Sequence, residues 1–147
     1  MPTPSETRWN SGQDCLATLM TASPENIALA FTKCNIKPFL DSEHRLLLEY
    51  VKVMRPICLA LDTLQGEHNC FLGLVLPVIV RLKARLNSLV LIDFDEFRTA
   101  ILERIEERFG KLFDNDDYVL AAVTHPRFKL NWISDEAKRD FKSICKM

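Results

Sequence analysis

Apolar residues recur at intervals of three and four along most of this chain, which is the period of an amphipathic α-helix. The same period predicts helices over residues 13–20 and 24–34, and a third that starts at Asp41 or Ser42 and ends before Gly66. It also predicts helices over residues 69–89, 93–113 and 135–146. The apolar run over residues 118–123 fits a helix or a strand, and we favour a helix. Because no convincing strand pairing is found, the pattern predicts an all-α fold, an irregular bundle of about six to seven helices.

Capping residues mark where several of these helices begin. Ser23 offers a hydroxyl cap and is followed by Pro24, a residue favoured in the first turn of a helix. After the break at Pro38, we expect Asp41 or Ser42 to cap the next helix.

Two prolines lie inside predicted helices. Pro56 removes a backbone donor, so we expect a kink there rather than the end of the helix. Pro77 should bend the 69–89 helix near Gly73. The first half of this helix is apolar on all sides, which predicts a central and fully packed position.

Length and charge suggest one ordinary globular domain. The chain has 147 residues, and we expect a loose segment over residues 1–12 and a single helical domain over residues 13–147. Lys and Arg number 19 against 20 Asp and Glu, giving a net charge of -1. This balance argues against a strongly basic nucleic-acid-binding domain, although a local basic face is compatible with it.

The sequence also bears on the cellular compartment. The most apolar run, residues 70–80, is about half the length of a bilayer crossing, and the N-terminus has no apolar core typical of a signal peptide. The five cysteines are scattered and odd in number, so we expect reduced thiols. These features predict a nuclear protein, with the cytoplasm as the alternative, and no membrane association.

Acidic clusters do not form a convincing metal site. Asp93, Asp95 and Glu96 lie close in sequence, but successive helix positions diverge by about 100°, whereas two-metal sites need converging carboxylates. We therefore interpret them as residues that favour the start of a helix. The loop at residues 114–117 is no calcium loop, because Val119 and His125 occupy the positions that require glycine and glutamate.

No other pattern predicts a metal, a cofactor or catalytic residues. Cys58, His68 and Cys70 lack the paired spacing of structural zinc sites. Nucleophile and phosphate-loop motifs are also absent, and the chain has only four glycines. We expect no catalytic residue, no metal and no cofactor.

Basic residues give a modest signal for nucleic acid. Arg81 and Arg85 share one helix face. Arg104, Arg108 and Lys111 form another row, but glutamates lie among them, so we favour a solvated surface over phosphate contacts there.

The pair Arg8 and Trp9 stands in a polar stretch outside any apolar stripe. Tryptophan can stack on a base and arginine can pair with phosphate. The alternative, that Trp9 anchors the start of the chain on the core, stays equally open.

Three segments, in this order, together resemble the hAT superfamily of transposases and their BED zinc-finger relatives. They are residues 7–11, residues 55–79 with the run Ala60-Leu61-Asp62-Thr63-Leu64-Gln65-Gly66-Glu67, and residues 121–132 with the run Thr124-His125-Pro126-Arg127-Phe128-Lys129. The family usually has Leu-Asp where this chain has Thr124 and His125.

The resemblance implies that this chain corresponds to the helical insertion that interrupts the ribonuclease-H-like domain of a hAT transposase. The three metal-binding acids of the family lie outside the matching segments, so a non-catalytic role is implied. Trp9 matches the family tryptophan that follows arginine and lies near DNA.

These observations lead to three functional hypotheses. We favour a non-catalytic, nuclear fragment of a hAT-type transposase-derived protein with weak DNA or partner binding. A helical protein-interaction module without a nucleic-acid role is the alternative, and an enzyme fragment completed by another chain ranks last. The expected DNA-binding residues are Arg8, Trp9, Arg81, Arg85, Arg127 and Lys129. The expected protein partner is a second copy or another transposase-like chain, which would bind an exposed apolar patch where the catalytic sheet would pack.

Overall fold

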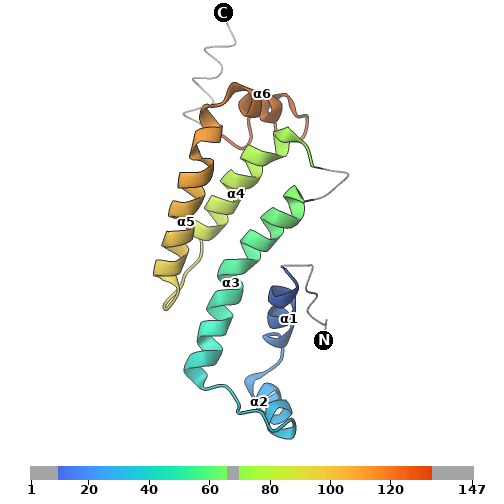
Figure 1. Ribbon diagram of the computed structural model, residues 1–147, viewed down its shortest axis with the longest axis vertical. Helices are drawn as coiled ribbons and strands as arrows, with labels where there is room; N and C mark the ends of the chain where they lie inside the picture. The colour runs from blue at the N-terminus through green and yellow to red at the C-terminus, as the bar shows by residue number, and fades with distance from the viewer. Residues whose placement is uncertain (1–9, 66–69, 134–147) are drawn as a thin grey trace, which may run out of the picture. The chain divides into compact units, whose positions relative to one another are not determined.

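A computed structural model describes residues 10–65 and 70–133 of the chain. Over these residues it contains six α-helices and two 3-10 helices and no strand, which confirms the predicted all-α class (Figure 1). The elements are α1 (Ser11–Leu19), α2 (Pro24–Lys33), α3 (Asp41–Leu64), η1 (Leu72–Leu74), α4 (Val75–Asn87), α5 (Asp95–Phe109), η2 (Gly110–Asp114) and α6 (Asp116–Thr124). The helix predicted over residues 135–146 lies outside the described residues. Within the described ranges, no helix combines the length and apolarity that a bilayer crossing requires.

The residues group into two compact units. Unit 1 comprises Met1–Leu59 with Ser88–Ala100, and unit 2 comprises Ala60–Asn87 with Ile101–Met147. The expectation of one domain over residues 13–147 stays a prediction.

In unit 1, local capping chemistry sets the helix starts. The Ser23 hydroxyl accepts a hydrogen bond from the backbone N–H of Asn26 at 3.4 Å, and Pro24 is the first residue of α2, as predicted. The side chain of Gln13 in α1 donates to the backbone carbonyl of Val51 in α3 at 3.3 Å. Ile27 and Val53 are buried apolar residues of this unit.

The predicted cap of α3 was wrong. The helix already includes Asp41, and the carbonyl of Leu40 accepts its first helical hydrogen bond, from the N–H of His44. The leucine side chain has no oxygen with which to cap the helix, and the contact at this helix start is instead the Glu43 carboxylate, which accepts from the Leu40 N–H at 2.8 Å. As predicted, Pro56 does not end the helix, which runs on to Leu64.

In unit 2, the predicted 69–89 helix begins later than the sequence suggested. Residues Leu72–Leu74 form the 3-10 helix η1, and α4 starts only at Val75. Pro77 therefore lies in the first turn of α4, where backbone N–H groups have no helical partner, and not in the middle of a bent helix. Leu76 and Ile79 are buried, as a packed first half requires, but Phe71 and Leu72 of the same run are 45% and 43% exposed, so the prediction that this half is packed on all sides was wrong.

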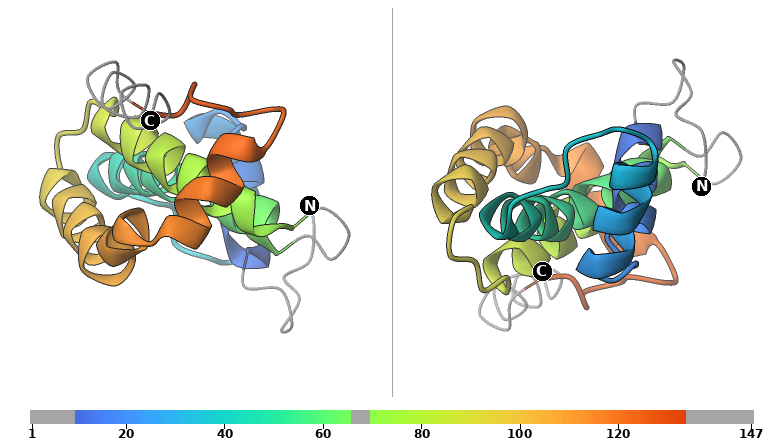
Figure 2. Two further views of the ribbon diagram at one scale, coloured as in Figure 1. Left: turned by 90° about the horizontal axis from the view of Figure 1, so that it is seen from above. Right: turned by 90° about the horizontal axis from the view of Figure 1, so that it is seen from below.

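The last two described helices follow the sequence pattern closely. Helix α5 ends at Phe109 and is followed by η2, so the 93–113 prediction holds within a few residues. The ambiguous run over residues 118–123 is helical and belongs to α6, whose start is capped by the side chain of Asn115. Helix α6 packs against η1 and α4 (Figure 2).

Candidate functional site

In unit 2, η1 packs tightly against α6 at a glycine. A Cβ atom added to Gly73 would lie 2.4 Å from the backbone oxygen of Ala121 and 3.0 Å from its carbonyl carbon. Because real Cβ atoms do not approach backbone so closely, only glycine fits at this point. Gly73 thus allows the residues on either side of the contact, Phe71 and His125, to meet.

Phe71 and His125 form a stacked pair at this junction. Their ring centroids are 4.9 Å apart and their planes differ by 15°. His125 also lies 5.0 Å from the ring of Phe128, and the guanidinium of Arg127 lies 5.8 Å from the Phe128 ring centroid. The backbone N–H of Arg127 donates to Nδ1 of His125 at 3.2 Å, which orients the imidazole. Three rings and one cation are therefore joined in one cluster, which we call the aromatic cluster.

An open hollow of about 420 Å³ adjoins the aromatic cluster. It is lined by Phe71, Leu72, Gly73, Ala121, Thr124 and His125. None of these residues is acidic, so the walls of the hollow offer no charge repulsion to an anion.

A larger open groove, of about 710 Å³, lies in the same unit beside α4, α5 and η2. Lys83 on its wall is ion-paired with Glu106, and Glu107 and Asp114 also line it. Because acidic and basic groups share this wall, the groove does not favour an anionic ligand.

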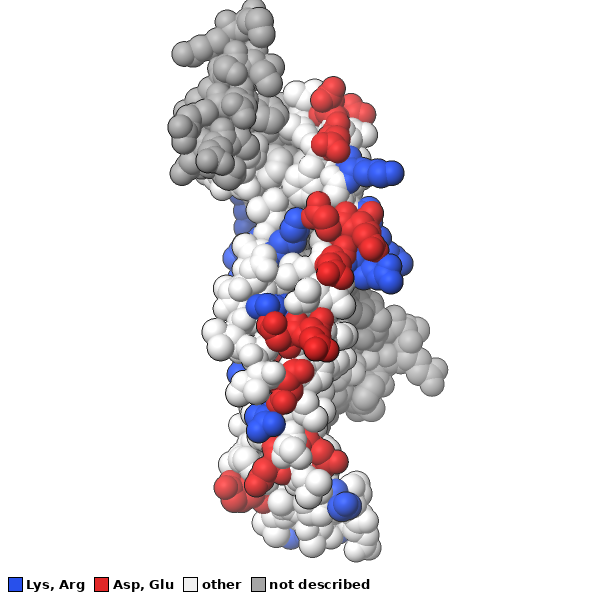
Figure 3. Space-filling model, turned by 90° about the vertical axis from the view of Figure 1, so that its left-hand side faces the viewer, with Lys and Arg blue, Asp and Glu red and all other residues white. Residues whose placement is uncertain are grey.

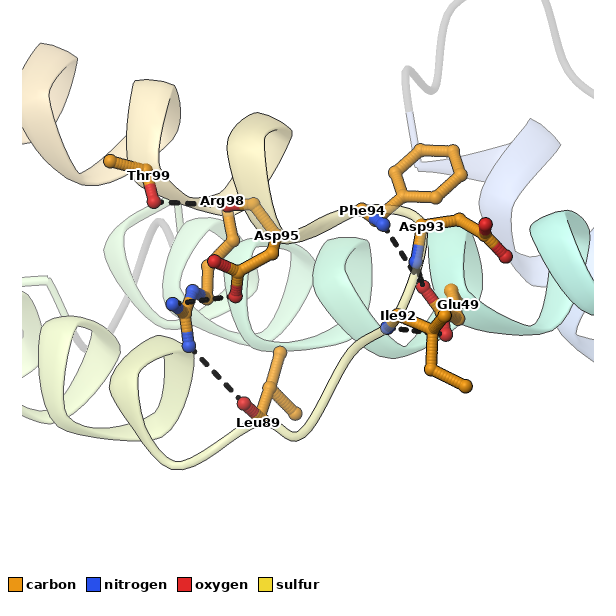
Figure 4. A network of polar contacts seen from close by, with 8 residues as sticks. All are labelled: Glu49, Leu89, Ile92, Asp93, Phe94, Asp95, Arg98 and Thr99. Carbon is orange, nitrogen blue, oxygen red and sulfur yellow. Dashed lines mark hydrogen bonds and ion pairs between the residues drawn. The ribbon is translucent and has the colours of Figure 1, made fainter.

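The acidic stretch at the start of α5 is held by a carboxylate from elsewhere in unit 1 (Figure 4). Glu49 of α3 accepts hydrogen bonds from the backbone N–H groups of Ile92 at 2.9 Å, Asp93 at 2.9 Å and Phe94 at 3.0 Å. Burial would raise the pKa of Glu49, but the three backbone donors and nearby Lys52 outweigh it and lower that pKa. Glu49 therefore fixes the backbone directly before helix α5.

The neighbouring acids are engaged in ion pairs. Asp93 is paired with Arg45 at 2.7 Å, and Asp95 is paired with Arg98 at 2.7 Å. Arg98 also donates to the backbone carbonyl of Leu89 at 3.2 Å. These contacts agree with the structural interpretation of the acidic cluster, and Glu49, its central residue, was missed from the sequence.

No metal site is formed by the residues that the structure describes. Over residues 10–65 and 70–133, no three His, Cys, Asp or Glu side chains gather as a metal would need. Asn115 and Asp116, within the rejected calcium loop, serve as the cap and the first residue of α6. Of the three zinc candidates, Cys58 is buried, Cys70 is exposed, and His68 lies outside the described residues.

The predicted DNA-binding residues are found on two parts of unit 2. Arg81 and Arg85 are exposed one turn apart on α4 and share a face, as predicted. Arg127 and Lys129 are exposed in the segment after α6, and Arg127 belongs to the aromatic cluster. Arg8 and Trp9 lie outside the described residues.

Charge on the visible surface is mixed. On the face drawn in Figure 3, acidic side chains lie beside basic ones, so the coloured residues of that face form no continuous basic surface. Arg104, for example, is paired with Glu107 at 2.8 Å, which fits the interpretation of this row as a solvated surface.

The sequence overlooked most of the aromatic cluster. Phe71 belongs to the run that the sequence predicts as apolar on all sides and fully packed, but it precedes η1 and is 45% exposed. For His125 the sequence indicated a place in the rejected calcium loop and in the third family-like segment, not a stacking partner. The one available signal was the cation and the aromatic residue, Arg127 and Phe128, directly after His125 and Pro126, a pattern too common to be specific.

Comparison with known proteins adds no relative: no protein-family model, no curated protein and no solved structure matches this chain.

Proposed function

We propose that this chain is a non-catalytic helical region of a hAT-type, transposase-derived protein that binds DNA weakly. It corresponds in this proposal to the helical insertion of the ribonuclease-H-like domain and acts in the nucleus. Phosphodiester cleavage is not part of the proposal, because the acids that the family uses lie outside the matching segments.

The observation that carries the proposal is the packing of two family-like segments on each other. Gly73 lies in the second segment and Ala121 in the third, 48 positions away along the chain, and a Cβ atom at Gly73 would lie only 2.4 Å from the backbone oxygen of Ala121. Phe71 and His125 extend the same junction. If the second and third segments are both needed to form this contact, their joint similarity to the family has a physical reason.

Exposed cations supply the proposed DNA contacts. Arg81, Arg85, Arg127 and Lys129 are exposed on unit 2. Contacts of this kind neutralise phosphates and release counterions, so they position DNA without reading its sequence. With a net charge of -1 the affinity should be low, and it should depend steeply on salt.

The test is a titration of fluorescently labelled duplex DNA by the full chain at several salt concentrations. We expect the logarithm of the affinity to fall linearly with the logarithm of salt, and each Arg→Ala change at Arg81, Arg85 or Arg127 to reduce the slope by about one. Arg8→Ala and Trp9→Ala should weaken binding too. Arg104→Ala is the control, because Arg104 belongs to the row on α5 that we interpret as a solvated surface with glutamates among its cations. Binding that is absent, or insensitive to salt, would contradict the proposal.

A second candidate function is protein association through unit 1. Val90 and Ile92, just before α5, are 89% and 76% exposed. These two aliphatic side chains stand two positions apart in one loop, and an exposed apolar patch is where a protein partner would bind. Analytical ultracentrifugation tests this: salt-independent self-association that is lost in a Val90→Ser, Ile92→Ser variant supports the alternative, and a monomer at all concentrations excludes association between copies.

A further inference from the structure

The aromatic cluster presents a flat apolar surface next to a cation. Phe71 is 45% exposed although one of its faces lies against His125. A phenyl ring covered on one face and still half exposed offers its other face or its edge to the hollow that it lines. Together with the nearly parallel imidazole, it is suited to stacking with a further planar ring.

The charge around this surface favours an anion. Arg127 is exposed and lies beside Phe128, two positions after the stacked His125. Lys129 is also exposed, with a positive φ of 48° that turns the chain directly after the cluster. The hollow itself has no acidic lining residue.

Nδ1 of His125 accepts the N–H of Arg127, so the neutral ring carries its proton on Nε2. The same contact ties the cation-bearing segment to the stacking surface. A ligand with a planar ring and a phosphate therefore meets groups already held together, which lowers the cost of ordering them.

We propose that the hollow binds an unpaired base of single-stranded nucleic acid, which stacks on Phe71 while an adjacent phosphate pairs with Arg127. This inference rests on the proposed DNA-binding function and narrows its substrate. In a duplex both faces of each base are covered by neighbouring bases, and only an unstacked base has a free face to offer. Arginine pairs with phosphate through its fork of N–H donors.

The experiment compares a labelled oligothymidylate with a duplex of equal length, by fluorescence anisotropy on the full chain. We expect the single strand to bind more tightly. Phe71→Ala should weaken its binding on the order of tenfold, since stacking of one base on an aromatic side chain contributes that much. Phe109→Ala is the matched control, because Phe109 is 40% exposed in the same unit but lies outside the cluster.

Two further variants distinguish a loss of binding from a loss of folding. Phe71→Trp keeps a stacking ring, should retain affinity, and should show fluorescence quenching when the strand binds. Arg127→Gln changes an exposed side chain and should reduce the salt slope by about one. Circular dichroism spectra that match the unsubstituted chain confirm the fold of each variant.

The outcomes separate this inference from the function on which it rests. Equal or tighter binding of the duplex, or equal effects of Phe71→Ala and Phe109→Ala, overturns single-strand recognition but leaves DNA binding in place. Absence of salt-dependent binding to both DNAs overturns both. If Phe71→Ala weakens association with a protein but leaves DNA binding unchanged, the surface belongs to a protein partner and the inference is overturned.

Discussion

Gly73 gives the sharpest test of how unit 2 is packed, through the substitution Gly73→Ala. The added methyl group would lie 2.4 Å from the oxygen of Ala121, about 1 Å inside ordinary van der Waals contact. Both neighbours in this contact are backbone atoms, which cannot swing away as a side chain can. Helix α6 or η1 must therefore shift as a whole.

Gly73 has no positive φ, so the backbone conformation itself is accessible to alanine. The expected loss then comes from overpacking alone and amounts to about 1–3 kcal/mol. For a chain of this length, each kcal/mol lowers the melting temperature by about 2–4 °C, so we expect a decrease of about 2–12 °C.

Gly12→Ala is the matched control. A Cβ atom at Gly12 would meet nothing within 4 Å, and the residue lies in helix α1. Alanine is the better helix former, so this variant should be neutral or more stable by up to about 1 kcal/mol.

The assay is thermal unfolding followed by far-ultraviolet circular dichroism and by tryptophan fluorescence. In a Trp9→Phe background, the fluorescence comes from Trp132 alone, whose ring lies 6.5 Å from Phe113 in unit 2. A Gly73→Ala variant that melts together with the unsubstituted chain would refute the close approach of η1 and α6, and with it the geometry of the aromatic cluster.

Three further predictions concern other parts of the fold, all measured by urea unfolding. Leu86→Ala, which empties a fully buried site, should cost about 2–5 kcal/mol, whereas Leu120→Ala, at a side chain that is 55% exposed, should stay within about 0.5 kcal/mol. Ser23→Ala removes the cap of α2 and should cost about 0.5–2 kcal/mol, most of which Ser23→Asp should restore. Glu49 has a pKa lowered in the folded chain from its ordinary value of 4.5, so its contribution to stability is complete above that value and is lost as the pH falls through the folded pKa. Glu49→Gln should therefore be less stable at neutral pH and lose less stability on acidification; an identical pH dependence would contradict the role of the three backbone donors.

The helices were predictable because their signals are local. Ser23 and Pro24 lie next to the helix they start, and apolar spacing alone was enough to locate α5 and to favour a helix for α6. The errors at the starts of α3 and α4 have local causes too. Glu43 can replace a hydroxyl cap from three residues away, and Pro77 is better tolerated in a first turn than inside a helix.

Contacts between distant residues were not predictable in the same way. Glu49 meets the backbone of Ile92, 43 positions later, and nothing in the spacing of charges announces a bond to backbone N–H groups. Glu49 lies one helical turn before Val53, which the structure shows to be fully buried but which the sequence does not distinguish from its apolar neighbours. A carboxylate in line with a buried position requires donors, and the loop before α5 provides three of them.

The two units differ in what their polar and aromatic groups accomplish. In unit 1, Glu49 is 5% exposed and its oxygens accept hydrogen bonds from backbone donors, so this buried charge serves to fix a helix start. In unit 2, Phe71 and Arg127 keep exposed surface although neighbouring rings already fix their positions. Groups that are held in place and still accessible can bind a ligand without further ordering, which is why we place the binding surface at the aromatic cluster and not at the acidic start of α5.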